Sequence, residues 1–176
     1  MGRIVIVVVI LHVSQFVFSQ VSFDNRIIVD QSTMANQVES VFTADLDGDG
    51  DLDLISASRE DDKIAWYENI DGNGTYGAQM VLSTEADNAV AVHAGDVDGD
   101  GDMDVVAASF DDEKVVWFEN TDGLGLFSAE IIISQDANVI FGALSVYAVD
   151  MDDDDDLDVL VSSFFDNQIA WIENTD

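Results

Sequence analysis

The stretch that decides the fold is found at residues 45–69, which read DLDGDGDLDLISASREDDKIAWYEN. The same pattern returns at residues 96–120 as DVDGDGDMDVVAASFDDEKVVWFEN, and at residues 150–174 as DMDDDDDLDVLVSSFFDNQIAWIEN. The copies align without gaps, so the first Asp and the Trp keep one spacing, and the copies begin about 50 residues apart. Internal repeats of this length are typical of propellers and other repeat arrays.

Each copy contains short runs of β-branched and aromatic residues bounded by Gly, Asp and Asn, which is the pattern of β-strands. One run precedes the acidic loop, a second follows it, a third contains the Trp, and a fourth follows a Gly-rich turn. Four antiparallel strands make a propeller blade, so we expect an all-β fold of about three propeller-type blades, part of a larger propeller. The expected strands are 38–44, 54–58, 63–68 and 78–83 in the first copy, 89–95, 105–109, 114–119 and 129–134 in the second, and 144–149, 159–163 and 168–173 in the third.

The N-terminal residues precede the repeats and differ from them in composition. Arg3 is followed by an apolar run at 4–13 and by the small residue Ser19, which indicates a secretory signal peptide at 1–19. A bilayer span needs roughly 20 apolar residues, so a membrane helix is the weaker interpretation. We therefore expect a secreted or cell-surface protein that is not inserted in a membrane once the leader is removed.

One further strand is expected between the leader and the first unit, within residues 20–37. Residues 23–29 read FDNRIIV and match two of the expected fourth strands, YGAQMVL at 76–82 and FSAEIII at 127–133. The chain therefore opens on a fourth strand without a blade, and its third unit stops after a third strand. Propellers typically have four to eight blades, so we expect either a fragment of a longer product, which we favour, or association of copies. The expected unit boundaries are 38–88, 89–140 and 141–176.

The composition excludes several classes of function. The chain has 5 Lys and Arg against 37 Asp and Glu, a formal charge of −32, which excludes nucleic-acid binding and disfavours anionic membranes. Because the chain has no Cys, it has no disulfide, no thiol nucleophile and no thiolate zinc site. Yet 48% of its residues are hydrophobic, too many for an acidic disordered tail. The negative charge must be concentrated in one kind of feature or neutralised by an ion.

The acidic loop at 45–53 has the pattern of a metal site, with carboxylates at every odd position and glycine at Gly48 and Gly50. Two carboxylates about 5 Å apart repel each other by near 1 kcal/mol even in water, and a divalent cation reverses this effect. Calcium accepts six to eight oxygen ligands in irregular geometry, whereas magnesium demands a strict octahedron. Glycine permits the positive φ angles that wrap the chain around one ion. The expected ligands are the side chains of Asp45, Asp47, Asp49 and Asp53, with the backbone carbonyl of Asp51.

An EF-hand loop begins in the same way, but it needs Glu at position 12 and flanking helices. Position 12 is Ser56, Ala107 or Val161, each in an expected strand, so an EF-hand does not fit. The unit instead resembles the FG-GAP/VCBS family of repeats, which includes the calcium-binding blades of integrin α-subunit propellers. The resemblance rests on the DxDGDGDxD motif, the Trp that follows it, and the Phe141-Gly142 pair before the third loop.

This resemblance implies one calcium ion in each acidic loop, held through positions 1, 3, 5 and 9 and through the backbone at position 7. In the third loop Asp153 and Asp155 replace the glycines, and we expect weaker binding there unless the extra charge compensates. The implied ligands are Asp45, Asp47, Asp49, Asp51 and Asp53 in the first loop, Asp96, Asp98, Asp100, Asp102 and Asp104 in the second, and Asp150, Asp152, Asp154, Asp156 and Asp158 in the third.

No catalytic residue set is unique to one copy, so we expect a protein that is not an enzyme. Trp66, Trp117 and Trp171 are expected to pack between blades, and the Glu-Asn pair that follows each Trp to form turn hydrogen bonds. The sequence favours a calcium-stabilised extracellular module for adhesion or recognition, whose partner is an unknown protein or glycan. The alternatives are a carbohydrate-binding propeller and an accessory region of a larger secreted enzyme.

Overall fold

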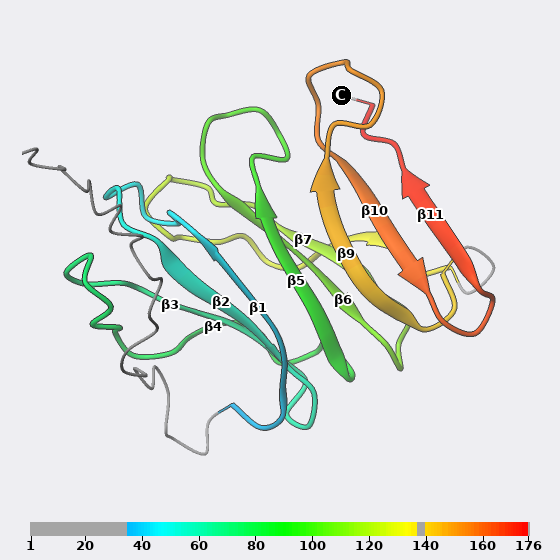
Figure 1. Cartoon of the computed structure of the whole chain (residues 1–176), viewed down its shortest axis with the longest axis horizontal. Coiled ribbons are helices and arrows are strands. Elements are labelled where there is room, and N and C mark those ends of the chain that lie inside the picture. The colour runs from blue at the N-terminus through cyan, green and yellow to red at the C-terminus, as the bar shows by residue number, and fades with distance from the viewer. Residues whose placement is uncertain (1–34, 137–139, 176) are drawn as a thin grey trace, which may run out of the picture.

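The computed structural model describes residues 35–136 and 140–175, which form an all-β fold of three antiparallel sheets (Figure 1). The predicted signal peptide at 1–19 and the predicted strand at 23–29 lie outside the described residues. In the part of the chain that is described, no helix is long and apolar enough to cross a membrane. The strands are β1 Val38–Ala44, β2 Asp53–Ser58, β3 Lys63–Tyr67, β4 Met80–Ser83, β5 Ala89–Gly95, β6 Asp104–Ser109, β7 Val115–Phe118, β8 Ile131–Ser134, β9 Ala143–Val149, β10 Asp158–Ser163 and β11 Gln168–Ile172.

Each sheet is one propeller-type blade whose strands pair in chain order. Blade 1 consists of β1 to β4 and blade 2 of β5 to β8, while blade 3 has β9, β10 and β11 among the described residues. Sequence neighbours pair directly, so that Ile55 on β2 lies opposite Phe42 on one side and Trp66 on the other. The predicted all-β blades are confirmed, and the blades stand side by side without closing a ring (Figure 1).

The blades pack on each other through apolar side chains that alternate along their strands. The core between blades 1 and 2 includes Leu46, Ile55 and Phe118, each fully buried. The core between blades 2 and 3 is built in the same way around Val106 and Val161. Burying one side chain of this size contributes about 1.5–3 kcal/mol, so blade-to-blade packing is a main source of stability.

The innermost strands of the blades, β1, β5 and β9, lie next to one another (Figure 1). The ring of His93 on β5 lies between Phe42 and Tyr147, with centroid distances of 4.3 and 4.1 Å. Its Nδ1 accepts the backbone N–H of Ala148 at 3.3 Å. Burial lowers the pKa of His93, so its imidazole is neutral near pH 7 and serves as a packed acceptor between blades.

Candidate metal centres

The three acidic loops connect the first and second strands of their blades, and therefore lie at corresponding ends of the three sheets (Figure 1). In each loop three carboxylates converge, with one oxygen from each within 4.8 Å of the others. Burial, and then repulsion from neighbouring carboxylates, raises the pKa of Asp47 and of Asp98. The converging sets are Asp45, Asp47 and Asp53 in the first loop, Asp96, Asp98 and Asp100 in the second, and Asp150, Asp152 and Asp158 in the third.

The aspartate at position 9 closes each loop through two backbone hydrogen bonds. In blade 1 the carboxylate of Asp53 accepts the N–H of Leu46 at 2.9 Å and the N–H of Asn69 at 2.8 Å. In blade 2 the corresponding carboxylate is Asp104, which is 1% exposed, and burial raises its pKa to about 6. The nearby indole of Trp117 lowers that pKa, although its N–H does not reach hydrogen-bond geometry.

The aspartate at position 1 is the clearest sign that a cation belongs in these loops. One oxygen of Asp45, Oδ2, accepts the N–H of Gly50 at 3.0 Å, but its Oδ1 is buried and has no hydrogen-bond partner among the described residues. Asp96 repeats this arrangement with Gly101. A buried carboxylate oxygen without a donor is costly, and a hard cation supplies the missing interaction. The donor set therefore fits calcium, which binds oxygen ligands.

Position 7 is different, because its side chain points away from the converging set. The carboxylate of Asp51 lies against Gly72, where an added Cβ would come within 2.3 Å of its Oδ1. Asp102 lies against Gly123 in the same way. This placement leaves only the backbone of position 7 for an ion. Position 5 varies, since Asp100 joins its set whereas Asp49 is outside it, although the Oδ1 of each accepts the N–H of position 7 at 2.9 Å.

The third loop has the backbone of the other two but lacks their glycines. Asp153 and Asp155 have φ angles of 64° and 76°, in the region that Gly48 and Gly50 occupy at 71° and 94°. The N–H of Asp153 donates to Oδ1 of Asp150 at 2.7 Å, so this oxygen has a partner that its counterparts lack. The backbone of the third loop is thus strained, and Oδ1 of Asp150 has a hydrogen-bond donor without an ion. Both features favour weaker ion binding in this loop.

Replacing both residues with glycine, Asp153→Gly with Asp155→Gly, is expected to stabilise the protein. Each non-glycine residue at such a φ costs on the order of 1 kcal/mol, so the pair should gain about 2 kcal/mol, or roughly 4–8 °C in melting temperature. Thermal unfolding in EDTA measures this gain without an ion. The reverse change at one position, Gly99→Asp, meets no atom within 4 Å and should destabilise the protein by about half as much. If neither variant changes the melting temperature, the positive φ angles of Asp153 and Asp155 do not strain the third loop.

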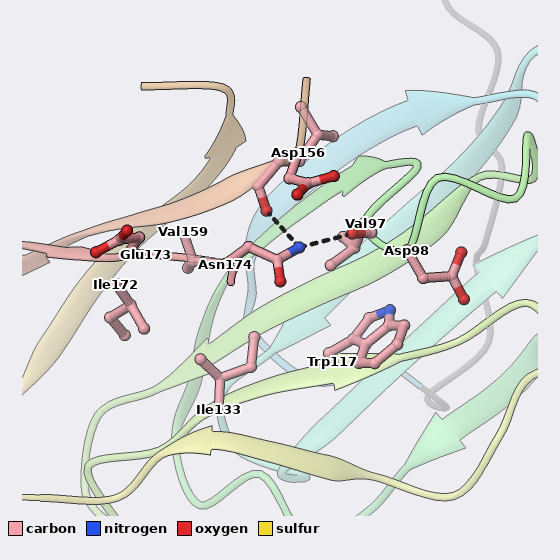
Figure 2. A pocket seen from close by; sticks show the side chains of 10 residues that line it. Val97, Asp98, Trp117, Ile133, Asp156, Val159, Ile172, Glu173 and Asn174 are labelled. Carbon is pink, nitrogen blue, oxygen red and sulfur yellow. Dashed lines mark hydrogen bonds between the residues drawn. The ribbon is translucent and has the colours of Figure 1, made fainter. Parts of the chain in front are cut away.

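The Asn that follows each Trp has a role that sequence reasoning missed. The expected turn bond is present, since Asn69 and Asn120 accept the N–H groups of Gly74 and Gly125, and in blades 2 and 3 the Asn side chain also connects two blades. Asn120 donates Nδ2–H to the carbonyl of Leu46 in the loop of blade 1 at 2.8 Å. Asn174 donates in the same way to Val97 in blade 2, at 3.0 Å (Figure 2). The repetition of Asn after each Trp is the only sequence signal for this contact, and it does not indicate the partner.

Comparison with known proteins agrees with this architecture. Residues 45–107 and 97–161 match the profile of a family described as FG-GAP-like repeat. A search of curated proteins finds no match to the chain. Repeats of this family are generally modules for structure or recognition rather than catalysis, and they often bind calcium. The matches cover more than half of the chain and fall on the blades that carry the acidic loops, so the chain belongs to the FG-GAP-like repeat family.

Proposed function

We propose that this protein is a secreted calcium-binding module whose propeller-type blades are stabilised by calcium for extracellular adhesion or recognition. The observation that carries the proposal is the buried, unpartnered Oδ1 atom of Asp45 and of Asp96, each inside a set of converging carboxylates. Repulsion within such a set opposes the compact loop, and burial reduces the solvent that would screen it. Bound calcium supplies the positive charge and the ligand for these oxygens.

Calcium has a structural role in this proposal and takes part in no reaction. The loop fixes the carbonyls of Leu46 and Val97, which accept the Asn side chains of the following blades. An ordered loop therefore stabilises the connection between the first two strands of its own blade and also the packing of that blade on the next one. Because carboxylate ligands must be ionised, ion binding is coupled to folding and to pH.

The recognition role is supported by a cluster of phenylalanines at the end of the blades opposite the acidic loops. Phe165 lies 4.8 Å from Phe141 and 5.2 Å from Phe164 between ring centroids, and each of the three residues is about half exposed. Exposed apolar clusters of this kind commonly mark interaction sites. Trp66 is 3% exposed and offers no ring face to a sugar, but Trp171 is 47% exposed, so carbohydrate binding remains the alternative function.

Titration of Ca²⁺ into the calcium-free chain, followed by calorimetry, tests the proposal. We expect binding with Kd values of about 10⁻⁴ M at pH 7.5, the tighter end of the range of extracellular modules. The double variant Asp45→Asn with Asp96→Asn should lose this binding. At pH 5.5 the affinity should be lower than at pH 7.5, because burial and then neighbouring carboxylates raise the pKa of Asp98, a member of the converging set, and a proton competes with the ion there.

The matched control is Asp51→Asn, which removes the same charge from a side chain that points away from the set. This variant keeps the backbone carbonyl and should bind calcium within a few-fold of the unmodified chain. If no binding heat is detected for any of these proteins at calcium concentrations up to tens of millimolar, the calcium proposal fails.

A further inference from the structure

The hydrogen bonds that close the acidic loops also join one loop to the next. In the first loop the carboxylate of Asp53 at position 9 accepts the N–H of Leu46 at 2.9 Å, and the carbonyl of Leu46 accepts an Nδ2–H of Asn120 at 2.8 Å. The backbone N–H of Asn120 donates in turn to Oδ1 of Asp104, which is position 9 of the second loop, at 2.7 Å. The position-9 carboxylates of two neighbouring loops are therefore connected through Leu46 and Asn120.

The same connection repeats between the second and third loops. The other oxygen of Asp104, Oδ2, accepts the N–H of Val97 at 3.0 Å, and the carbonyl of Val97 accepts an Nδ2–H of Asn174 at 3.0 Å (Figure 2). The backbone N–H of Asn174 donates to Oδ1 of Asp158 in the third loop at 2.8 Å. Asp104 takes part in both connections, so one chain of hydrogen bonds runs through all three loops.

This chain of hydrogen bonds is buried at the junction of blades 1 and 2. Leu46 and Asp53 are 0% exposed, and Asp104 and Asn120 are 1% exposed. At such a depth the loss of one hydrogen bond leaves a polar group without a partner, which is costly. A displacement of the first loop therefore destabilises the second loop as well.

The side chain of Asn120 uses all of its hydrogens at this junction. One hydrogen of its Nδ2 group is donated to Leu46 in the first loop, and the other to the carbonyl of Met103 in the second loop, at 3.3 Å. Its Oδ1 accepts the N–H of Gly125 at 3.3 Å. Because an amide nitrogen has only two hydrogens, Asn120 keeps these partners only when both loops are in place.

We propose that Asn120 is a positioning residue that couples the first and second loops, so that calcium bound in one loop raises the calcium affinity of the other. This inference rests on the proposed function, because it assigns calcium to both loops. An ion in the first loop fixes the carbonyl of Leu46, which holds Asn120 and directs its backbone N–H at Asp104. The second loop is then partly ordered before its own ion binds, so binding loses less conformational entropy. The coupling acts equally in the other direction.

The sign of the coupling distinguishes this connection from a purely electrostatic effect. A bound ion makes the potential around its loop less negative, and this change weakens the attraction of the next ion. Salt screens the effect beyond about 8 Å at physiological ionic strength. Electrostatics alone therefore predicts independent or weakly opposed binding, whereas the hydrogen-bonded connection predicts that the two ions favour each other.

Calorimetric titration with Ca²⁺ at physiological salt measures the coupling. All proteins carry Asp150→Asn, which removes position 1 of the third loop. Asp45→Asn then leaves only the second loop intact, and Asp96→Asn leaves only the first. We expect the second stepwise binding constant of the protein with both loops intact to exceed the constants of these single-loop proteins by at least about fivefold.

The variant Asn120→Ala should reduce this factor to about one, because alanine keeps the backbone N–H but has no group that reaches Leu46. The matched control is Asn69→Ala in blade 1. Asn69 donates Nδ2–H to Leu52 and accepts the N–H of Gly74, but it has no hydrogen bond to another blade among the described residues. This control loses the same bonds inside its own blade and should keep the coupling. An equal loss of coupling in both variants would overturn the role of Asn120.

Amide hydrogen exchange gives a local measurement that needs no ion in the second loop. In the Asp96→Asn protein, calcium in the first loop should slow exchange of the Val97 amide at least about fivefold, and adding Asn120→Ala should abolish the response. The first part of this test stands even if Asn120→Ala does not fold. If the loops bind calcium with equal, independent constants and Val97 does not respond, this inference is wrong while the proposed function stands. If no protein binds calcium, both are wrong.

Discussion

Chelation of calcium with EDTA is expected to lower the melting temperature of the protein by roughly 10–20 °C relative to a solution with about 10 mM calcium. An ion that binds only the folded state stabilises it by about 2.7 kcal/mol at a concentration 100 times its Kd. The two loops with a buried unpartnered oxygen should together contribute about 5 kcal/mol, and each kcal/mol corresponds to roughly 2–4 °C for a chain of this size. Differential scanning calorimetry with calcium and with EDTA measures the difference.

The controls separate calcium from general charge screening. Magnesium at the same concentration should restore only part of the loss, because it demands strict octahedral geometry and keeps its waters. The double variant Asp45→Asn with Asp96→Asn should melt at nearly the same temperature in calcium and in EDTA. An equal response to magnesium, or a double variant that still responds fully to calcium, would mean that the ions act on the acidic surface as a whole.

The sequence predicted the blades well because two independent patterns agree: the alternation of apolar residues within each strand and the repeat of the whole unit along the chain. Alternating apolar residues define each strand, and the fixed spacing from the first Asp to the Trp repeats the order of strands. The prediction was less accurate at the fourth strands, where β4 begins at Met80 rather than at residue 78. The residues before Met80 pair through a single bridge between Asn69 and Tyr76, which a propensity pattern does not distinguish from a strand.

The burial of the Trp residues depends on the neighbouring blade, which a local pattern does not contain. Trp66 is buried because the turn at Gly125 covers it, so closely that an added Cβ would lie 2.5 Å from the indole. Trp171 is half-exposed because, among the described residues, no blade follows blade 3 to cover it as blade 2 covers Trp66. The same local sequence thus gives opposite burial, and only the arrangement of the blades decides which one is observed.

The candidate metal sites show what spacing can and cannot indicate. Alternate carboxylates predicted a site in each loop, and the structure brings three carboxylates together in each. The sequence analysis gave position 7 a backbone role and positions 1, 3, 5 and 9 the same side-chain role, whereas the structure separates position 1 from position 9. Position 1 offers a free buried oxygen at Asp45, while position 9 is occupied by backbone donors at Asp53. These roles depend on which N–H groups the folded turn directs at each carboxylate.

This division of roles leads to the prediction with the largest effect of a single substitution. Asp104→Ala is expected to destabilise the protein by roughly 3–5 kcal/mol both with calcium and in EDTA. The carboxylate accepts the N–H of Val97 at 3.0 Å and the N–H of Asn120 at 2.7 Å, and its removal leaves both donors buried without a partner. The loss therefore does not require an ion, and urea unfolding in the two conditions measures it.

The matched control is Asp96→Asn in the same loop, where the substituted oxygen has no protein donor to lose. Its remaining carbonyl oxygen still accepts the N–H of Gly101, so this variant should be destabilised in calcium and nearly unchanged in EDTA. If both variants are destabilised in calcium but not in EDTA, Asp104 acts only as an ion ligand, and its backbone hydrogen bonds contribute little to stability. If the stability loss of each variant is the same in calcium and in EDTA, and only Asp104→Ala is strongly destabilised, hydrogen bonds hold the loop. The calcium proposal is then wrong for blade 2.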